Sequence, residues 1–147
     1  MTTLSERFLT LHPDALSACG ATTDEVAEAE RTLGVSFPEA LRRYLMELGY
    51  VEAGSAEFFG LGAGVPKHLN LVDRTIAERT TLHPNIPRHL IPVLNDGCGN
   101  HFCIDLRDGT ADPPIVFWSH ELGTDQTPGR VADSFSRWLL DDSGDEA

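Results

Sequence analysis

The hydrophobic period of this sequence changes from helical to alternating near residue 90, and this change constrains the fold more than any other feature. Upstream, Leu41, Tyr44, Leu45 and Leu48 follow the spacing i, i+3, i+4 and i+7, which places them on one face of a helix. Downstream, "HFCIDL" alternates apolar and polar residues as a strand does. Helical spacing then returns in the last segment. The order of helices, antiparallel sheet and closing helix predicts an α+β fold.

Two neighbouring segments carry the signals that begin and end helices. In "ATTDEVAEAERTLG", Thr22 and Glu25 form a capping-box pattern, and the final glycine suits a left-handed position after the helix. "SFPEALRRYLMELG" repeats this pattern with Ser36 and Glu39, and Pro38 is tolerated in the first turn. The two segments are joined by "GVS", so they are predicted to form an N-terminal helical hairpin.

Shorter patterns predict the other elements on the helical side. One helix precedes the hairpin and ends before Pro13, and a glycine-rich loop after the hairpin contains an extended piece at Glu57–Leu61. A third helix runs from about Leu69 to Arg79, and the last helix closes the domain. The residues predicted to face inward from these three helices are Leu4, Phe8, Leu11, Leu69, Val72, Ile76, Val131, Phe135, Trp138 and Leu139.

Three apolar stretches, "LIPVL", "HFCIDL" and "IVFW", are predicted to form the central antiparallel sheet. The turn "NDGCGN" joins the first two, and "RDGTADPP" joins the second to the third. In the middle strand, Phe102, Ile104 and Leu106 share the predicted core face. His101, Cys103 and Asp105 lie on the opposite face, and Asp105 is expected to be structural, bonding a nearby backbone group. Trp118 is predicted to be a core residue of the third strand.

Length and charge limit the classes of protein to consider. The chain has 147 residues, which favours a single domain over 1–147, with its core at about 21–140 and an acidic tail at 141–147. Eleven basic and 23 acidic residues give a net charge of −12. Such a surface repels nucleic acid and anionic membranes, which are bound through Lys and Arg. It suits either a basic protein partner or simple solubility.

The sequence also gives expectations about compartment and thiols. No apolar run approaches the roughly 20 residues that cross a bilayer. The start, "MTTLSERFLT", has neither the basic nor the apolar region of a signal peptide, so a cytoplasmic location is expected. The three cysteines are an odd number and are expected to be thiols.

The stretch "NDGCGNHFCIDL" raises the question of chemistry. Cys98, His101 and Cys103 supply three zinc-type ligands, but a structural site needs four, usually as two spaced pairs, so no metal or other cofactor is predicted. A catalytic thiol at Cys98 needs positive surroundings, whereas its neighbours in the sequence include Asp96, Asp105 and Asp108. The glycines are better explained by a chain reversal, and the protein is predicted not to be an enzyme.

Four motifs in order resemble the SUKH superfamily, whose Smi/Knr-type fold is shared by fungal cell-wall-synthesis regulators and bacterial immunity proteins. They are "TTDEVAEAERTLGVSFPEALRRYLMELG", "LIPVLNDGCGNHFCIDL", "IVFWSHE" and "VADSFSRWL". The resemblance covers about residues 21–140. It implies a non-catalytic protein that neutralises a cognate toxin domain by direct binding, and a basic, nuclease-type toxin fits the acidic charge. The alternatives are a regulatory or scaffold domain of the same fold, and a cysteine-dependent hydrolase.

A partner-binding surface is expected on the rim made by the turns and the loop after the third strand, because binding residues concentrate in such loops. These segments are "NDGCGN", "RDG" and "SHELGTD". The predicted contact residues are Asp96, Asn100, Asp108, His120, Glu121 and Asp125.

Overall fold

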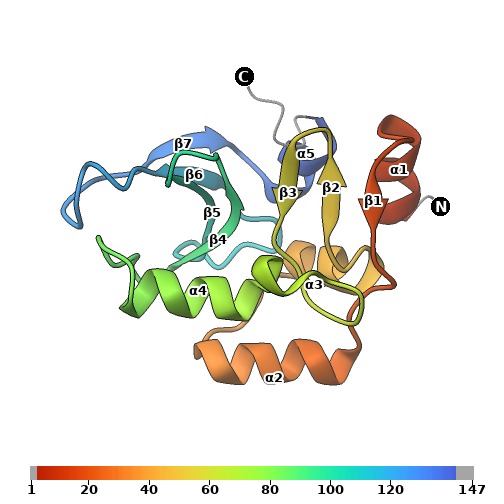
Figure 1. The fold of residues 1–147 in the computed structure, drawn as a ribbon, viewed down its shortest axis with the longest axis horizontal. Helices are drawn as coiled ribbons and strands as arrows, with labels where there is room; N and C mark the ends of the chain where they lie inside the picture. The colour runs from red at the N-terminus through yellow and green to blue at the C-terminus, as the bar shows by residue number, and fades with distance from the viewer. Residues whose placement is uncertain (1–2, 142–147) are drawn as a thin grey trace.

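The computed structural model describes residues 3–141, which form an antiparallel sheet with helices before, within and after it (Figure 1). The helices are α1 (Leu4–Leu11), α2 (Thr23–Leu33), α3 (Glu39–Glu47), the 3-10 helix η1 (Lys67–Leu69), α4 (Leu71–Thr80) and α5 (Phe135–Asp141). The strands are β1 (Leu16–Ser17), β2 (Val51–Ala53), β3 (Ala56–Phe58), β4 (Leu90–Asn95), β5 (His101–Asp105), β6 (Ile115–Trp118) and β7 (Gly129–Ala132). The predicted α+β class is confirmed.

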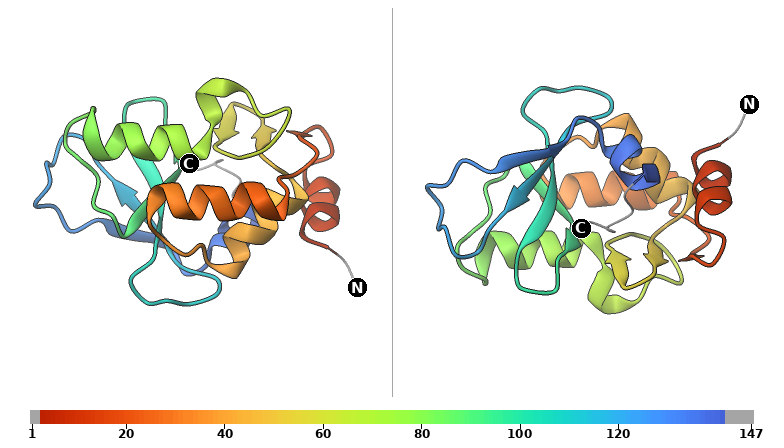
Figure 2. Two further views of the ribbon diagram at one scale, coloured as in Figure 1. Left: turned by 90° about the horizontal axis from the view of Figure 1, so that it is seen from below. Right: turned by 90° about the horizontal axis from the view of Figure 1, so that it is seen from above.

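The seven strands lie in the sheet in the order in which they occur in the chain, and each pairs antiparallel with the next. Successive connections therefore alternate between the two ends of the sheet. Helices α2 and α4 contact each other and run side by side on one side of the sheet, as both further views show (Figure 2). Within the described part of the chain, no helix is both long enough and apolar enough to cross a membrane.

The start of the helical hairpin is confirmed at α2 and corrected at α3. The Thr22 hydroxyl accepts from the Glu25 amide, the Glu25 carboxylate accepts from the Thr22 amide, and Gly34 follows α2 with φ 71°. The Ser36–Glu39 capping box is wrong. Helix α3 instead begins after Pro38, which caps it with no side-chain hydrogen bond.

The connection between α2 and α3 is closed by a carboxylate from α2. One oxygen of Glu30 accepts from the Phe37 amide at 2.6 Å and from the Arg42 guanidinium at 2.8 Å. Proline favours an extended conformation in the residue before it, so the helix cannot begin earlier, and Ser36 lies too far upstream to cap it. The Glu30 carboxylate therefore holds the segment before α3, and α3 itself has no side-chain cap.

Helix α4 buries only part of the face that apolar spacing predicts, since Val72 packs against the core but Ile76 does not. Leu71, Thr75 and Glu78 are buried, whereas Ile76 is exposed. The predicted inward position of Leu11 in α1 is also wrong, because that side chain is 55% exposed. A polar face of α4 turns toward the sheet because Glu78 has a buried partner there, which spacing of apolar residues cannot reveal.

Three strands fall where the sequence analysis placed a loop or a helix. Only the first residues of the predicted extended piece at Glu57–Leu61 belong to β3. Strand β2 pairs with β3 as a hairpin. Val131 lies in β7 and is 44% exposed, so its assignment to the closing helix is wrong. That helix begins at Phe135, and its predicted core residues Phe135, Trp138 and Leu139 are buried. Of the predicted acidic tail, residues 142–147 lie outside the described residues.

Strand β5 is buried on both faces. Ile104 is fully buried in the main core, and Phe102 and Leu106 are half-buried against it. The opposite face is also covered, since His101 is only 1% exposed and Cys103 is fully buried. On that face a smaller apolar cluster contains Ile86, Leu90, Cys103, Val116 and Trp118, which confirms Trp118 as a core residue. Alternation correctly separates the two faces but does not tell whether the second one is covered.

Gly60 provides a test of how closely the chain packs where β3 leads into η1. Its amide donates to the Leu69 carbonyl and its carbonyl accepts from the Leu71 amide. A Cβ at Gly60 would overlap the carbonyl oxygen of Gly49. We therefore expect Gly60→Ala to lower the free energy of unfolding by about 1–3 kcal/mol in urea titrations, because the backbone must shift. Gly129→Ala is the control, since a Cβ there meets no atom within 4 Å. Equal effects of the two substitutions would contradict this account.

Candidate partner-binding site

The turn between β4 and β5 is organised around one carboxylate. Oδ1 of Asp96 accepts from the backbone amides of Cys98 at 2.7 Å and Asn100 at 3.1 Å, and Oδ2 accepts from the Asn100 side-chain amide at 2.8 Å. Gly97 and Gly99 have φ of 87° and 94°, values that glycine adopts without strain. Burial opposes ionisation of Asp96, but the hydrogen bonds from Asn100 and Cys98 hold its pKa below the ordinary value.

The same turn is joined to the loop between β6 and β7. Oδ1 of Asn100 accepts from the backbone amide of His120 at 2.9 Å and lies 2.7 Å from its Nδ1, so Nδ1 carries the proton and donates. Gln126 braces the loop: its Oε1 accepts from the Ser119 amide, and its Nε2 donates to the carbonyls of Ser119 and Gly123. The structure thus joins three of the predicted residues, Asp96, Asn100 and His120, in one chain of hydrogen bonds.

Five of the six predicted contact residues lie at one end of the sheet. His120, Glu121 and Asp125 follow β6, and they are exposed on the loop that Asn100 holds. Asp108 is different, because the β5–β6 connection lies at the opposite end. The register shows this directly, since His101 pairs with Trp118 near the first end and Ile104 pairs with Ile115 near the second. Asp108 therefore does not lie on the same rim as the other five predicted contact residues. We call the other five residues, Asp96, Asn100, His120, Glu121 and Asp125, the acidic rim.

At the opposite end, Asp105 has a structural role. Its Oδ1 accepts from the backbone amide of Arg107 at 3.0 Å, and its carboxylate also accepts from the Arg107 guanidinium. Burial opposes ionisation of Asp105, but these hydrogen bonds hold its pKa below the ordinary value. The expectation that Asp105 bonds a nearby backbone group is confirmed.

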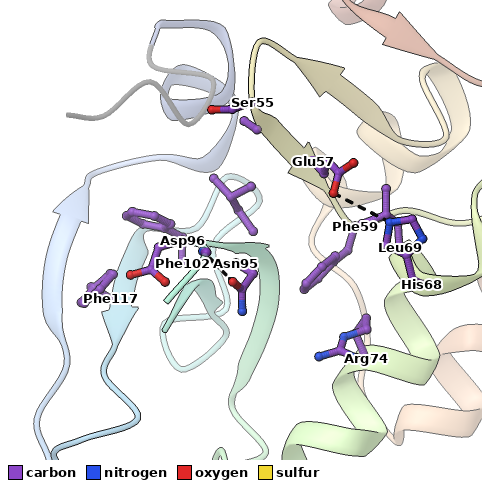
Figure 3. Close-up of a pocket in the computed structure, with 13 residues that line it drawn as sticks. Ser55, Glu57, Phe59, His68, Leu69, Arg74, Asn95, Asp96, Phe102 and Phe117 are labelled. Atoms are coloured by element: carbon purple, nitrogen blue, oxygen red, sulfur yellow. Dashed lines mark hydrogen bonds and ion pairs between the residues drawn. The ribbon is translucent and has the colours of Figure 1, made fainter. Parts of the chain in front are cut away.

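A groove of about 750 Å³ adjoins the turn, and sequence analysis missed it (Figure 3). One wall carries Phe59, His68 and Arg74, and the other carries Asp96, Phe102 and Phe117. We call this feature the aromatic groove; its lining residues are Ser55, Ala56, Glu57, Phe59, His68, Leu69, Arg74, Leu94, Asn95, Asp96, Gly97, Phe102 and Phe117. The aromatic content of "FFGL" and "IVFW" was the available signal, but these residues are brought together only by the sheet.

The three cysteine thiols lie in different environments. Cys19 and Cys98 are exposed, whereas Cys103 is buried, and burial raises the pKa of its thiol well above the ordinary value. The thiol of Cys103 therefore stays protonated at neutral pH. Among residues 3–141, no group of three His, Cys, Asp or Glu side chains is placed to hold a metal ion.

A family model and a solved structure both match this chain. The family model SUKH_6, described as SMI1-KNR4 cell-wall, matches residues 23–139, and the chain belongs to this family. The resemblance based on four sequence motifs is thereby confirmed. A solved crystal structure of a protein from Pseudomonas syringae pv. tomato is similar, with a TM-score of 0.66, 23% sequence identity and 94% of each chain covered. At this identity the likeness supports the fold alone. No curated protein matches the sequence.

Asp96 gives a test of the turn. We expect Asp96→Ala to lower the free energy of unfolding at pH 7 by about 1 kcal/mol, because three hydrogen bonds in an exposed turn are lost. Its folded pKa lies below its unfolded value of about 3.9, so its stabilisation is present above that value. The difference between parent and variant should therefore shrink as the pH falls through the folded pKa. Urea unfolding between pH 7 and pH 3 measures it, with the exposed Asp125→Ala as control. A difference that does not vary with pH would contradict the role of ionisation.

Proposed function

We propose that this protein is a non-catalytic binding protein that neutralises a cognate toxin domain by direct contact, as immunity proteins of its family do. Membership of the SUKH_6 family over residues 23–139 carries this proposal. The family has the fold of binding domains with immunity or regulatory roles, and the structure offers a well-ordered polar surface at one end of the sheet. The toxin is the partner, and the protein acts by covering its functional surface.

The charge of the chain indicates the kind of toxin surface that fits. With a net charge of −12, the protein attracts a basic surface such as one that a nuclease uses to hold nucleic acid. The acidic rim presents three carboxylates, from Asp96, Glu121 and Asp125, in place of phosphates. Oppositely charged surfaces steer two proteins together, so association should be fast at low salt.

The hydrogen bonds within the acidic rim support its role as the contact surface. Asp96 holds Asn100, and Asn100 holds His120, so the turn and the loop keep fixed positions before any partner arrives. Binding to a surface that is already ordered avoids the entropic cost of ordering it on contact. A preorganised rim therefore suits rapid and specific docking.

Charge reversal at the two ends of the sheet tests the position of the interface. Glu121→Lys should slow association with a basic toxin about threefold at low salt, because it reverses a charge within the acidic rim. Asp108→Lys makes the same change in net charge at the opposite end and should have a much smaller effect. Stopped-flow association rates at several salt concentrations measure both variants. Equal slowing by the two variants would place the interface elsewhere, and a rate indifferent to salt would remove the electrostatic mechanism.

Growth rescue tests the function itself. The cognate toxin domain is sought in the neighbouring gene and expressed with or without this protein. Co-expression should restore growth.

The family description names the cell wall, which favours a regulatory domain as the second candidate. A regulatory or scaffold protein would bind several partners and would give no protection.

A substitution at Cys98 distinguishes a binding function from thiol chemistry. Cys98→Ser should neutralise the toxin as well as the parent does, because the exposed turn is held by Asp96 and the backbone rather than by the thiol. Treatment with a thiol-alkylating reagent provides a second measurement on the parent protein. Loss of protection in Cys98→Ser, with the fold intact by circular dichroism, would favour the cysteine-dependent hydrolase.

A further inference from the structure

The aromatic groove exists because the sheet opens between β3 and β4. These two strands pair at one position, Phe58 with Leu94, and the Phe59 amide donates to the Val93 carbonyl beside it at 2.9 Å. The register of β4 shifts between Pro92 and Leu94, next to this contact. The hairpin of β2 and β3 and the turn after β4 then form the two sides of the groove (Figure 3).

One wall of the groove contains an aromatic pair that is partly open to solvent. Phe102 and Phe117 are opposite each other on β5 and β6, and their rings pack edge to face at 5.2 Å. Phe102 also packs against Trp138 of α5, at 5.6 Å, so one side of this pair belongs to the core. Both phenylalanines nevertheless remain partly exposed. Such a surface can accept an apolar side chain from another molecule, which would gain contact with both rings.

The sides of the groove carry two carboxylates. Glu57 lies on one side and Asp96 on the other, and the Glu57 side chain is 49% exposed. Arg74 also lines the groove, and its guanidinium lies 3.5 Å from the Glu78 carboxylate and over the ring of Phe59. His68 lies 3.7 Å from Glu57. The groove therefore combines an aromatic wall with a carboxylate on each side.

We infer that the aromatic groove receives an extended segment of the protein partner, in which an apolar side chain is flanked by basic residues. The apolar side chain rests on Phe102 and Phe117, and the basic side chains reach Glu57 and Asp96. A second copy of this chain fits less well, because both copies would carry a net charge of −12. The inference rests on the proposed function for the identity of the partner, but the recognition chemistry follows from the groove.

Two synthetic peptides test this chemistry without the toxin. The first, GSKFKVKSG, has apolar residues between lysines, and the second has glutamate at each lysine position. Each is titrated into nitrogen-15-labelled protein while backbone amide signals are followed by NMR. The lysine peptide should shift the amides of Glu57, Phe59, Asp96, Phe102 and Phe117, and the glutamate peptide should not. Shifts centred elsewhere, no shifts, or equal shifts with both peptides would overturn the inference.

Matched variants locate the contact. Phe117→Ser should weaken binding of the lysine peptide about tenfold, whereas Leu16→Ser, which removes an exposed leucine on β1, should not. Glu57→Lys should weaken it as well, and Glu28→Lys on the outer face of α2 should not. If Phe117→Ser fails to fold, the Glu57 and Glu28 pair still decides the question. Equal effects of Glu57→Lys and Glu28→Lys would overturn the inference.

Growth rescue separates this inference from the proposed function. If the parent protein protects cells but Phe117→Ser and Glu57→Lys protect equally well, the groove is not the contact and the proposed function stands. If the lysine peptide binds the groove but the parent gives no protection, recognition by the groove stands and the toxin-neutralising role fails. Sedimentation velocity of the parent tests the other occupant, since a dimer that Phe117→Ser abolishes would show that a second copy fills the groove.

Discussion

A buried polar contact between the Glu78 carboxylate and the His101 imidazole connects helix α4 to the sheet, beside the candidate site. Oε2 of Glu78, on α4, lies 2.9 Å from Nε2 of His101, and both side chains are more than nine-tenths buried. His101 is the first residue of β5, directly after the turn that Asp96 organises. Helix α4 also provides Arg74, which stacks over Phe59 in the aromatic groove. One polar contact thus sets α4 against β5 and places the groove beside the turn.

This contact is better understood as a determinant of specific packing than as a source of large stability. Burying an ionisable pair has a desolvation cost that its attraction only offsets, but removing Glu78 would leave the buried His101 without this partner. Thr75 Oγ1 and His101 Nδ1 are also buried without a hydrogen-bond partner in the structure. A more apolar interface between α4 and β5 would tolerate several helix positions. The polar pair favours one position, in which Ile76 is exposed and Leu71 is buried.

The sequence predicts those features whose cause lies within a few residues. Thr22, Glu25 and Gly34 contain the whole signal for the ends of α2, and alternation in "HFCIDL" is enough to separate the faces of β5. The sequence fails where the cause is a distant residue. Glu30 on the previous helix binds the segment before α3, where a cap at Ser36 was predicted, and Glu78 on α4 is buried against His101. The groove could not be predicted, because its residues come from β3, η1, α4, β4, β5 and β6.

The order of the strands also explains why one of the six predicted contact residues lies apart from the other five. In a sheet whose strands follow chain order, successive turns lie at opposite ends, so Asp108 cannot join residues that follow β4 and β6. The five that remain are linked to the groove by Asp96, which lines it and also bonds Asn100, the residue that holds His120. The acidic rim and the aromatic groove are therefore continuous. A partner that docks on the rim as proposed would lie next to the groove, and a single turn would serve both proposed contacts.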